Sequence, residues 1–110
     1  MYTNLILPAV QDYLAGGARK RCIVDKYGEI NNWDVSNVTD MERMFGSAES
    51  FNQPLNNWNV SKVTHMSYMF EYAESFNQPL NKWNVSNVED MEDMFNNAES
   101  FNQPLHAPWY

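Results

Sequence analysis

The pentapeptide Phe-Asn-Gln-Pro-Leu occurs three times in this chain, at 51–55, 76–80 and 101–105, and the spacing is 25 residues each time. Three units therefore follow one another at 31–55, 56–80 and 81–105, and sixteen of their 25 positions are identical in all three. A fixed period of this length is typical of repeat proteins, in which each unit buries its apolar face against its neighbours. The repeat predicts a solenoid, and a length of 110 residues predicts that it is a single domain.

Each unit carries two hydrophobic patterns. In the second unit Met66, Met69, Phe70 and Ala73 are spaced as one stripe of a short helix. The segment 58–60, Trp-Asn-Val, alternates apolar and polar residues and predicts a very short strand. Together the patterns predict the α/β class, as a leucine-rich-repeat-like solenoid of three 25-residue strand–helix coils.

Residues 1–30 do not repeat and are predicted to form a helical N-terminal cap. Leu7, Val10 and Leu14 share one helical face, the glycines at 16 and 17 end that helix, and a second helix is expected over 18–27. The first coil of a solenoid has an open apolar edge, which such a cap covers. Residues 31–110 are then the three-repeat solenoid with a short C-terminal tail.

The repeats carry two resemblances to known families. The pattern Leu55-x-x-Trp58-x-Val60-x-x-Val63 resembles, in part, the strand core of a leucine-rich repeat. The longer string W-[DN]-V-S-x-V-x-x-M-x-x-M-F-x-x-A-x-S-F-N-Q-P-L resembles the BspA-like surface-protein repeats that are abundant in mycoplasma lipoproteins and other microbes. The second resemblance implies a leucine-rich-repeat-like solenoid with adhesion or protein-binding roles, often at the cell surface.

Composition and charge exclude several classes of partner and site. The formal net charge of −7 argues against a nucleic-acid phosphate backbone as partner, and no apolar run is long enough for membrane insertion. One cysteine and two histidines exclude a disulfide framework and the usual zinc clusters. No signal peptide or lipid-attachment site is visible, so the default expectation for localisation is cytoplasmic, despite the resemblance to surface proteins.

No enzyme motif is visible, and neither a cofactor nor a metal is predicted. The chain shows no Ser-His-Asp, Cys-His or paired-carboxylate arrangement at the level of a motif. The repeat tryptophans and methionines recur at core spacing, so we expect them to pack in the interior. The acidic cluster at 89–93 lacks the Gly-bearing loop of a calcium site and is expected to be a solvated face, although a bound cation is the alternative.

Two surfaces are candidates for binding a protein partner. Differences between the repeats collect on the outer face of the predicted helix, where exposed tyrosines are common interface anchors, and the candidates there are His65, Tyr68 and Tyr72. The opposite face, that of the predicted strands, offers small polar residues: Asp34, Asn59 and Asn84. The sequence therefore predicts a non-catalytic protein-interaction module of the adhesion type, with the partner unknown.

The alternative function is a self-assembling structural protein whose main partner is another copy of itself. The last coil is expected to expose an apolar edge at Trp83, Phe101, Leu105 and Trp109, which a second copy would cover in a two-fold homodimer. The competing expectation is that the last two residues fold over this edge and keep the chain monomeric.

Overall fold

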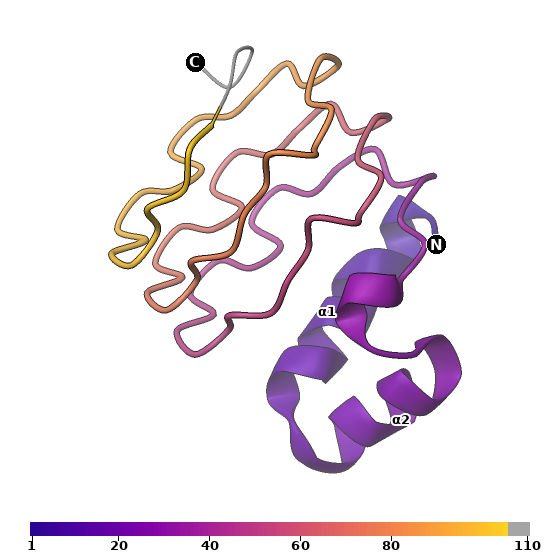
Figure 1. Ribbon diagram of the computed structural model, residues 1–110. Coiled ribbons are helices and arrows are strands. Elements are labelled where there is room, and N and C mark those ends of the chain that lie inside the picture. The colour runs from indigo at the N-terminus through magenta and orange to yellow at the C-terminus, as the bar shows by residue number, and fades with distance from the viewer. Residues whose placement is uncertain (106–110) are drawn as a thin grey trace.

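A computed structural model describes residues 1–105 and places two helices before the repeats (Figure 1). Helix α1 spans Thr3–Ala15, helix α2 spans Gly17–Tyr27, and a 3-10 turn, η1, spans Ile30–Asn32. Gly16 joins the helices with φ at +68°, a left-handed conformation that glycine adopts without steric cost. The helices pack against each other, and α1 covers the first repeat, with Thr3 Oγ1 accepting a 2.9 Å hydrogen bond from the Thr39 N–H.

The buried face of α1 differs from the prediction. Val10 is buried as expected, but Leu7 and Leu14 are 41% and 38% exposed. The buried stripe instead follows the i, i+3, i+4, i+7 spacing of Ile6, Ala9, Val10 and Tyr13. Leu7 and Leu14 therefore lie at the border between α1 and the repeats.

The predicted α/β leucine-rich-repeat-like solenoid of strand–helix coils is wrong. Between residues 33 and 105 the structure contains neither an α-helix nor a sheet, and its only strand-like pairings there are isolated parallel bridges. Two of these bridges connect the same position of successive repeats, from Asp40 to His65 and from His65 to Asp90. Each repeat is built from turns, and the whole chain forms a small compact molecule with a radius of gyration of 13.1 Å.

The predicted helix is replaced by overlapping tight turns because two residues of each repeat have a left-handed backbone conformation. Arg43 and Ser47 have φ near +60°, and the equivalent residues of the other two repeats share this conformation. Hydrogen bonds from Met44 to Met41 and from Ala48 to Phe45 close turns around these left-handed residues. A turn with a positive φ at its third residue is of type II geometry, and it cannot propagate as an α-helix.

The predicted strand fails because its polar residue bonds to its own backbone. Trp58 and Val60 are buried and Asn59 is exposed, so the alternation of side chains was predicted correctly. However, Asn59 Oδ1 accepts the Ser61 N–H at 3.1 Å, and the Val63 N–H bonds to Val60 O. These local turns use main-chain N–H and carbonyl groups that a sheet would have paired between neighbouring strands.

Along the segments 41–47 and 66–72, the main-chain hydrogen bonds between repeats run in one direction. Four N–H groups of the first repeat donate to carbonyls of the second at 2.7–3.0 Å, in the pairs Met41–His65, Arg43–Ser67, Phe45–Met69 and Ser47–Glu71. The second repeat donates to the third in the same way, in the pairs Met66–Asp90, Tyr68–Glu92, Phe70–Met94 and Tyr72–Asn96. At these alternate positions the N–H groups therefore point towards the next repeat. The N–H groups of Thr64 and Glu89, just before them, donate in the opposite direction, to Thr39 O and Thr64 O of the previous repeat.

The core is a pair of aromatic columns that run through all three repeats. Phe70 stacks between Phe45 and Phe95 at centroid distances of 5.5 and 5.6 Å, and Phe76 stacks between Phe51 and Phe101 at 5.9 and 6.0 Å. The repeat tryptophans are buried as predicted, and the indole of each donates to a main-chain carbonyl earlier in the chain: Trp33 to Gly28, Trp58 to Ile30 and Trp83 to Leu55.

Asparagine columns hold the opposite edge of the repeats together. Asn52 Oδ1 accepts the main-chain N–H of Asn77, and Asn77 Oδ1 accepts that of Asn102, both at 2.9 Å. Asn56 also donates its side-chain amide to Asn81 Oδ1 at 3.0 Å. Recurrent asparagines therefore hydrogen-bond along the direction in which the repeats stack.

Candidate functional site

Six side chains project from left-handed backbone along one edge of the repeats, and we call this surface the turn face. The residues form two columns with φ between 49° and 60°, and no member is glycine: Arg43, Tyr68 and Asp93 in one, Ser47, Tyr72 and Asn97 in the other. In all three repeats these positions differ. The turn face is therefore the place where the repeats share a backbone conformation and vary the side chain.

Left-handed backbone at these positions is costly for most residues. For an L-residue it brings Cβ close to the following carbonyl oxygen, at about 1–2 kcal/mol, while glycine avoids the penalty and asparagine and aspartate tolerate it. Only the third repeat uses the tolerant pair, Asp93 and Asn97. The first and second repeats hold arginine, serine and two tyrosines in the same conformation, which the main-chain bonds to the following repeat keep in place.

The structure brings two of the three predicted outer-face residues onto the turn face. Tyr68 is half-buried and Tyr72 is 46% exposed. The Arg43 guanidinium lies over the Tyr68 ring, 4.3 Å from its centroid, in a cation–π contact. His65 lies beside them in the chain of isolated bridges, half-buried, with its Nδ1 at 2.9 Å from the Thr64 hydroxyl.

The charges around Tyr68 keep its hydroxyl protonated. The Glu92 carboxylate raises the pKa of Tyr68, and partial burial and Asp93 raise it further, against a smaller lowering by Arg43. A neutral phenol that carries a hydroxyl donor next to acidic side chains is suited to accepting and donating hydrogen bonds at an interface.

The second predicted surface uses its polar atoms internally. Asp34, Asn59 and Asn84 are exposed, and each side-chain oxygen accepts the N–H of the residue two positions later. Asp34 also accepts the Ser36 hydroxyl at 2.6 Å, and the Ser36 hydrogen bonds hold the pKa of Asp34 below its usual value. These residues shape turns, and the structure does not bring them together with Tyr68 and Tyr72.

The predicted C-terminal edge is only partly described. Trp83 is buried and donates to Leu55 O, while Phe101 and Leu105 are half-buried against the core. Trp109 lies outside the described residues. Next to this edge the main-chain N–H groups of Met91, Asp93 and Asn97 have no acceptor among residues 1–105, because a following repeat would supply it.

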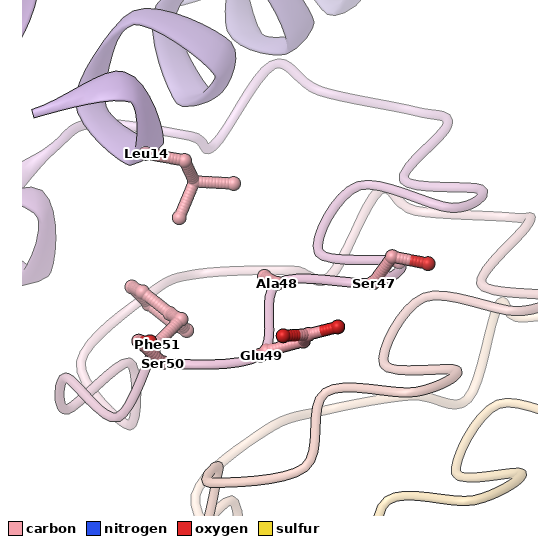
Figure 2. Close-up of a pocket in the computed structure, with 7 residues that line it drawn as sticks. Leu14, Ser47, Ala48, Glu49, Ser50 and Phe51 are labelled. Atoms are coloured by element: carbon pink, nitrogen blue, oxygen red, sulfur yellow. The ribbon is translucent and has the colours of Figure 1, made fainter.

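Sequence reasoning missed a hollow between α1 and the first repeat. Figure 2 shows Leu14 pointing from the end of α1 into the space above the segment 47–51. The hollow has a volume of about 350 Å³ and is lined on the repeat side by residues 46–51. The helical spacing of Leu14 predicted that it is buried, so the sequence did not indicate that it lines a hollow. Nothing in the sequence marks the residues with left-handed backbone either.

Two further features are absent from the described part of the chain: a metal-binding cluster and a membrane-spanning helix. Within it no group of three or more histidine, cysteine, aspartate or glutamate side chains is placed to hold a metal ion, and this includes the acidic cluster at 89–93. The described helices include none with the length and apolar character needed to cross a membrane.

Comparison with known families gives one match. A family model described as "Mycoplasma protein of unknown function, DUF285" matches residues 19–109, which covers most of α2 and all three repeats. No curated protein and no solved structure is significantly similar to the chain.

Proposed function

Because the chain belongs to the DUF285 family of mycoplasma proteins of unknown function, we propose its function from the geometry of the turn face. The chain is a non-catalytic protein-interaction module, and Tyr68 and Tyr72 with Arg43 form the centre of its contact surface. The resemblance of the repeats to BspA-like surface proteins is the reason for placing this interaction in the adhesion class.

One observation carries the proposal: left-handed backbone holds large side chains at the positions that differ between repeats. Stability alone would favour glycine or asparagine at these positions. Strained residues that the surrounding structure keeps in place are concentrated at functional sites. The retention of arginine and two tyrosines there supports selection for what these side chains contact.

The residue types support a protein partner. Tyrosine and arginine are enriched among the residues that dominate binding energy in protein interfaces. The Tyr68 backbone is held by its N–H bond to Glu92 O, and the ring is in contact with the Arg43 guanidinium, so part of its freedom is already lost before binding. A surface prepared in this way loses less entropy when a partner binds.

Photo-crosslinking from the turn face tests the proposal. A benzophenone side chain replaces Tyr72 in one protein and exposed Asn57, on a different turn, in the control. After incubation with cell extract, we expect a defined adduct from position 72 that is absent from position 57. Equal adducts from both positions, or none from position 72, would contradict the proposal.

A binding measurement with the captured protein completes the test. The double variant Tyr68→Asp/Tyr72→Asn carries the residues that the third repeat holds at these positions, so it keeps the backbone conformation. We expect at least about tenfold weaker binding, a loss of about 1.4 kcal/mol. Ser47→Asn, in the same column of the first repeat, is the matched control and is expected to bind as the parent does.

Self-assembly is the second candidate function, and the observation in its favour is that the N–H groups of Met91, Asp93 and Asn97 have no acceptor within residues 1–105. Their direction limits its geometry, because two third repeats related by a two-fold axis would set donors against donors. A head-to-tail contact, in which these donors meet carbonyls of another copy, satisfies both partners. Light scattering across concentrations tests it, since assembly requires a mass that rises with concentration.

A further inference from the structure

Two neighbouring hollows form a groove along the border between α1 and the first repeat. The first has a volume of about 430 Å³ and lies between Thr3, Leu7 and Gln11 of the helix and the segment 40–44. The second is the hollow of about 350 Å³ beneath Leu14, over the segment 46–51 (Figure 2). We call the two together the seam groove.

The seam groove is lined by the acceptor end of the main-chain ladder. Carbonyls of the second repeat accept the N–H groups of the first, and the first repeat presents the equivalent carbonyls of Asp40, Glu42, Met44 and Gly46. Within residues 1–105 none of these four carbonyls accepts a hydrogen bond. All four residues line the seam groove. Main-chain acceptors without a donor in residues 1–105 therefore lie along the seam groove.

The helix side of the seam groove is apolar. Leu7 and Leu14 are seven residues apart, so they lie on the same side of α1, about 10.5 Å apart along its axis. An extended chain covers that distance with about three to four residues. The groove therefore fits a short extended segment whose apolar side chains contact both leucines.

The charged residues of the seam groove favour an occupant with basic side chains. Asp40, Glu42 and Arg43 line the first hollow and Glu49 lines the second, which leaves three acidic side chains against one basic side chain. The Arg43 guanidinium lies over the Tyr68 ring and 3.9 Å from a Glu42 carboxylate oxygen. Basic side chains are thus favoured at the rim. A second copy fits less well, since two of its three donors that lack an acceptor within residues 1–105, Met91 and Asp93, lie in the acidic segment 89–93 and would bring carboxylates against carboxylates.

We propose that the seam groove binds an extended, apolar and basic segment of a partner protein. Main-chain N–H groups of the segment donate to the carbonyls of Glu42, Met44 and Gly46, and its apolar side chains contact Leu7 and Leu14. Addition of a chain to an exposed hydrogen-bonding edge is an established mode of peptide recognition. This site does not include Tyr68 or Tyr72, but Arg43 and Ser47 of the turn face line its two hollows, so the two proposed surfaces adjoin in the first repeat.

Peptides that differ only in their donors test the proposal. The probe is an acetylated, amidated heptapeptide of alternating lysine and leucine, and its N–H groups point alternately to its two edges. One N-methylated form removes the donors of the lysine residues, and a second removes those of the leucine residues. We expect one methylated form to bind as the parent peptide does and the other to bind at least about tenfold more weakly.

Carbonyl carbon chemical shifts report where the peptide binds. We expect the resonances of Glu42, Met44 and Gly46 to move on titration, because a carbonyl shift responds to a new hydrogen bond. The equivalent carbonyls of Ser67, Met69 and Glu71 already accept hydrogen bonds and should stay in place. No shifts at the three groove carbonyls, or equal weakening by both methylated peptides, would overturn the proposal.

Variants of α1 separate groove binding from general attraction to an acidic protein. The double variant Leu7→Ser/Leu14→Ser should weaken binding at least about tenfold, while Leu5→Ser, a half-exposed position outside the groove, should not. Equal effects of the two variants would contradict the site. If instead the parent's mass rises with concentration and Leu7→Ser/Leu14→Ser abolishes the rise, the groove binds a second copy, and the proposal of a peptide partner is wrong.

Discussion

Arg43 and Tyr68 occupy the same position of successive repeats, and both hold a left-handed backbone with φ near +58°. The Arg43 N–H bonds to Ser67 O next to Tyr68, while the guanidinium covers the Tyr68 ring at 4.3 Å. One main-chain ladder therefore fixes the backbone and also places one variable side chain against the next. Stability and presentation of the turn face depend on the same hydrogen bonds.

The hydrogen bonds from the second repeat to the third predict slower hydrogen exchange in the second repeat than at the equivalent positions of the third. The amides of Met66, Tyr68 and Tyr72 bond to the third repeat and should exchange slowly. Their equivalents Met91, Asp93 and Asn97 have no acceptor within residues 1–105 and should exchange much faster. Amide exchange measured by NMR at neutral pH checks this. Protection at Asp93 equal to that at Tyr68 would show that an unseen acceptor covers the last repeat.

The cost of left-handed backbone predicts that the parent is less stable than it could be. Tyr72→Asn should raise the free energy of unfolding by about 1 kcal/mol, because asparagine tolerates the conformation and Tyr72 is largely exposed. Urea denaturation measures the change. The reciprocal variant Asn97→Tyr is the control and should lower stability by a similar amount. A loss of stability in Tyr72→Asn would mean that the tyrosine ring makes a compensating contact.

The repeat period, the core residues and the asparagine columns could be predicted from the sequence because they follow from spacing and polarity. Trp58 and Phe70 are buried wherever the chain places them. The secondary structure could not, because Met66, Met69 and Phe70 satisfy a helical spacing that a series of tight turns also satisfies. The deciding fact, a positive φ at Tyr68 and Tyr72, runs against the preferences of tyrosine.

The tyrosines of the turn face could therefore be predicted from the sequence, whereas the seam groove could not. Variation between repeats drew attention to Tyr68 and Tyr72, since variable positions of a repeat are those that packing does not fix. The seam groove depends on the rotation of α1, which exposes Leu7 and Leu14 in place of the expected buried face. The rotation follows from the burial of Ile6 and Tyr13. The sequence could not show it, because Leu7 and Leu14 have the spacing of a buried helical stripe just as the residues that are buried do.

Trp58 combines packing with a buried hydrogen bond, and two variants separate these contributions. Its side chain is 3% exposed, and its indole N–H donates to Ile30 O at 2.8 Å. Trp58→Ala should cost about 3–5 kcal/mol, as truncation of large aromatic residues in cores does. Trp58→Phe keeps much of the packing and removes the indole hydrogen bond, while Ile30 O still accepts the Trp33 N–H at 3.2 Å, so it should cost about 0.5–1.5 kcal/mol. A cooperative thermal transition of Trp58→Ala close to that of the parent would contradict the core role.

The Asp34 turn predicts a pH dependence that the other repeats lack. Hydrogen bonds from Ser36 lower the pKa of Asp34 in the folded chain, so the unfolded chain binds more protons there at low pH. The stabilisation is present above the unfolded value of 3.8 and is lost as the pH falls through the lower folded value. Asp34→Asn, which copies Asn59 and Asn84, should make urea midpoints less sensitive to pH below about 4. Equal sensitivity in parent and variant would exclude this contribution.

Tyr13 predicts the opposite dependence at high pH. Burial, with the nearby Glu29 carboxylate, raises the pKa of Tyr13 from 10.0 to about 12, and its hydroxyl donates to Glu29 Oε2 at 3.2 Å. The folded chain then keeps a proton that the unfolded chain releases, so the stabilisation is complete below pH 10.0 and is lost as the pH rises to about 12. At pH 9 we expect Tyr13→Phe to be less stable by about 0.5–1.5 kcal/mol, the usual contribution of one hydrogen bond. Urea midpoints of the two proteins should converge between pH 10 and 12, because only the parent loses stability through Tyr13. A constant difference across this range would show that Tyr13 ionises equally readily in both states, and that its contact with Glu29 does not anchor α1.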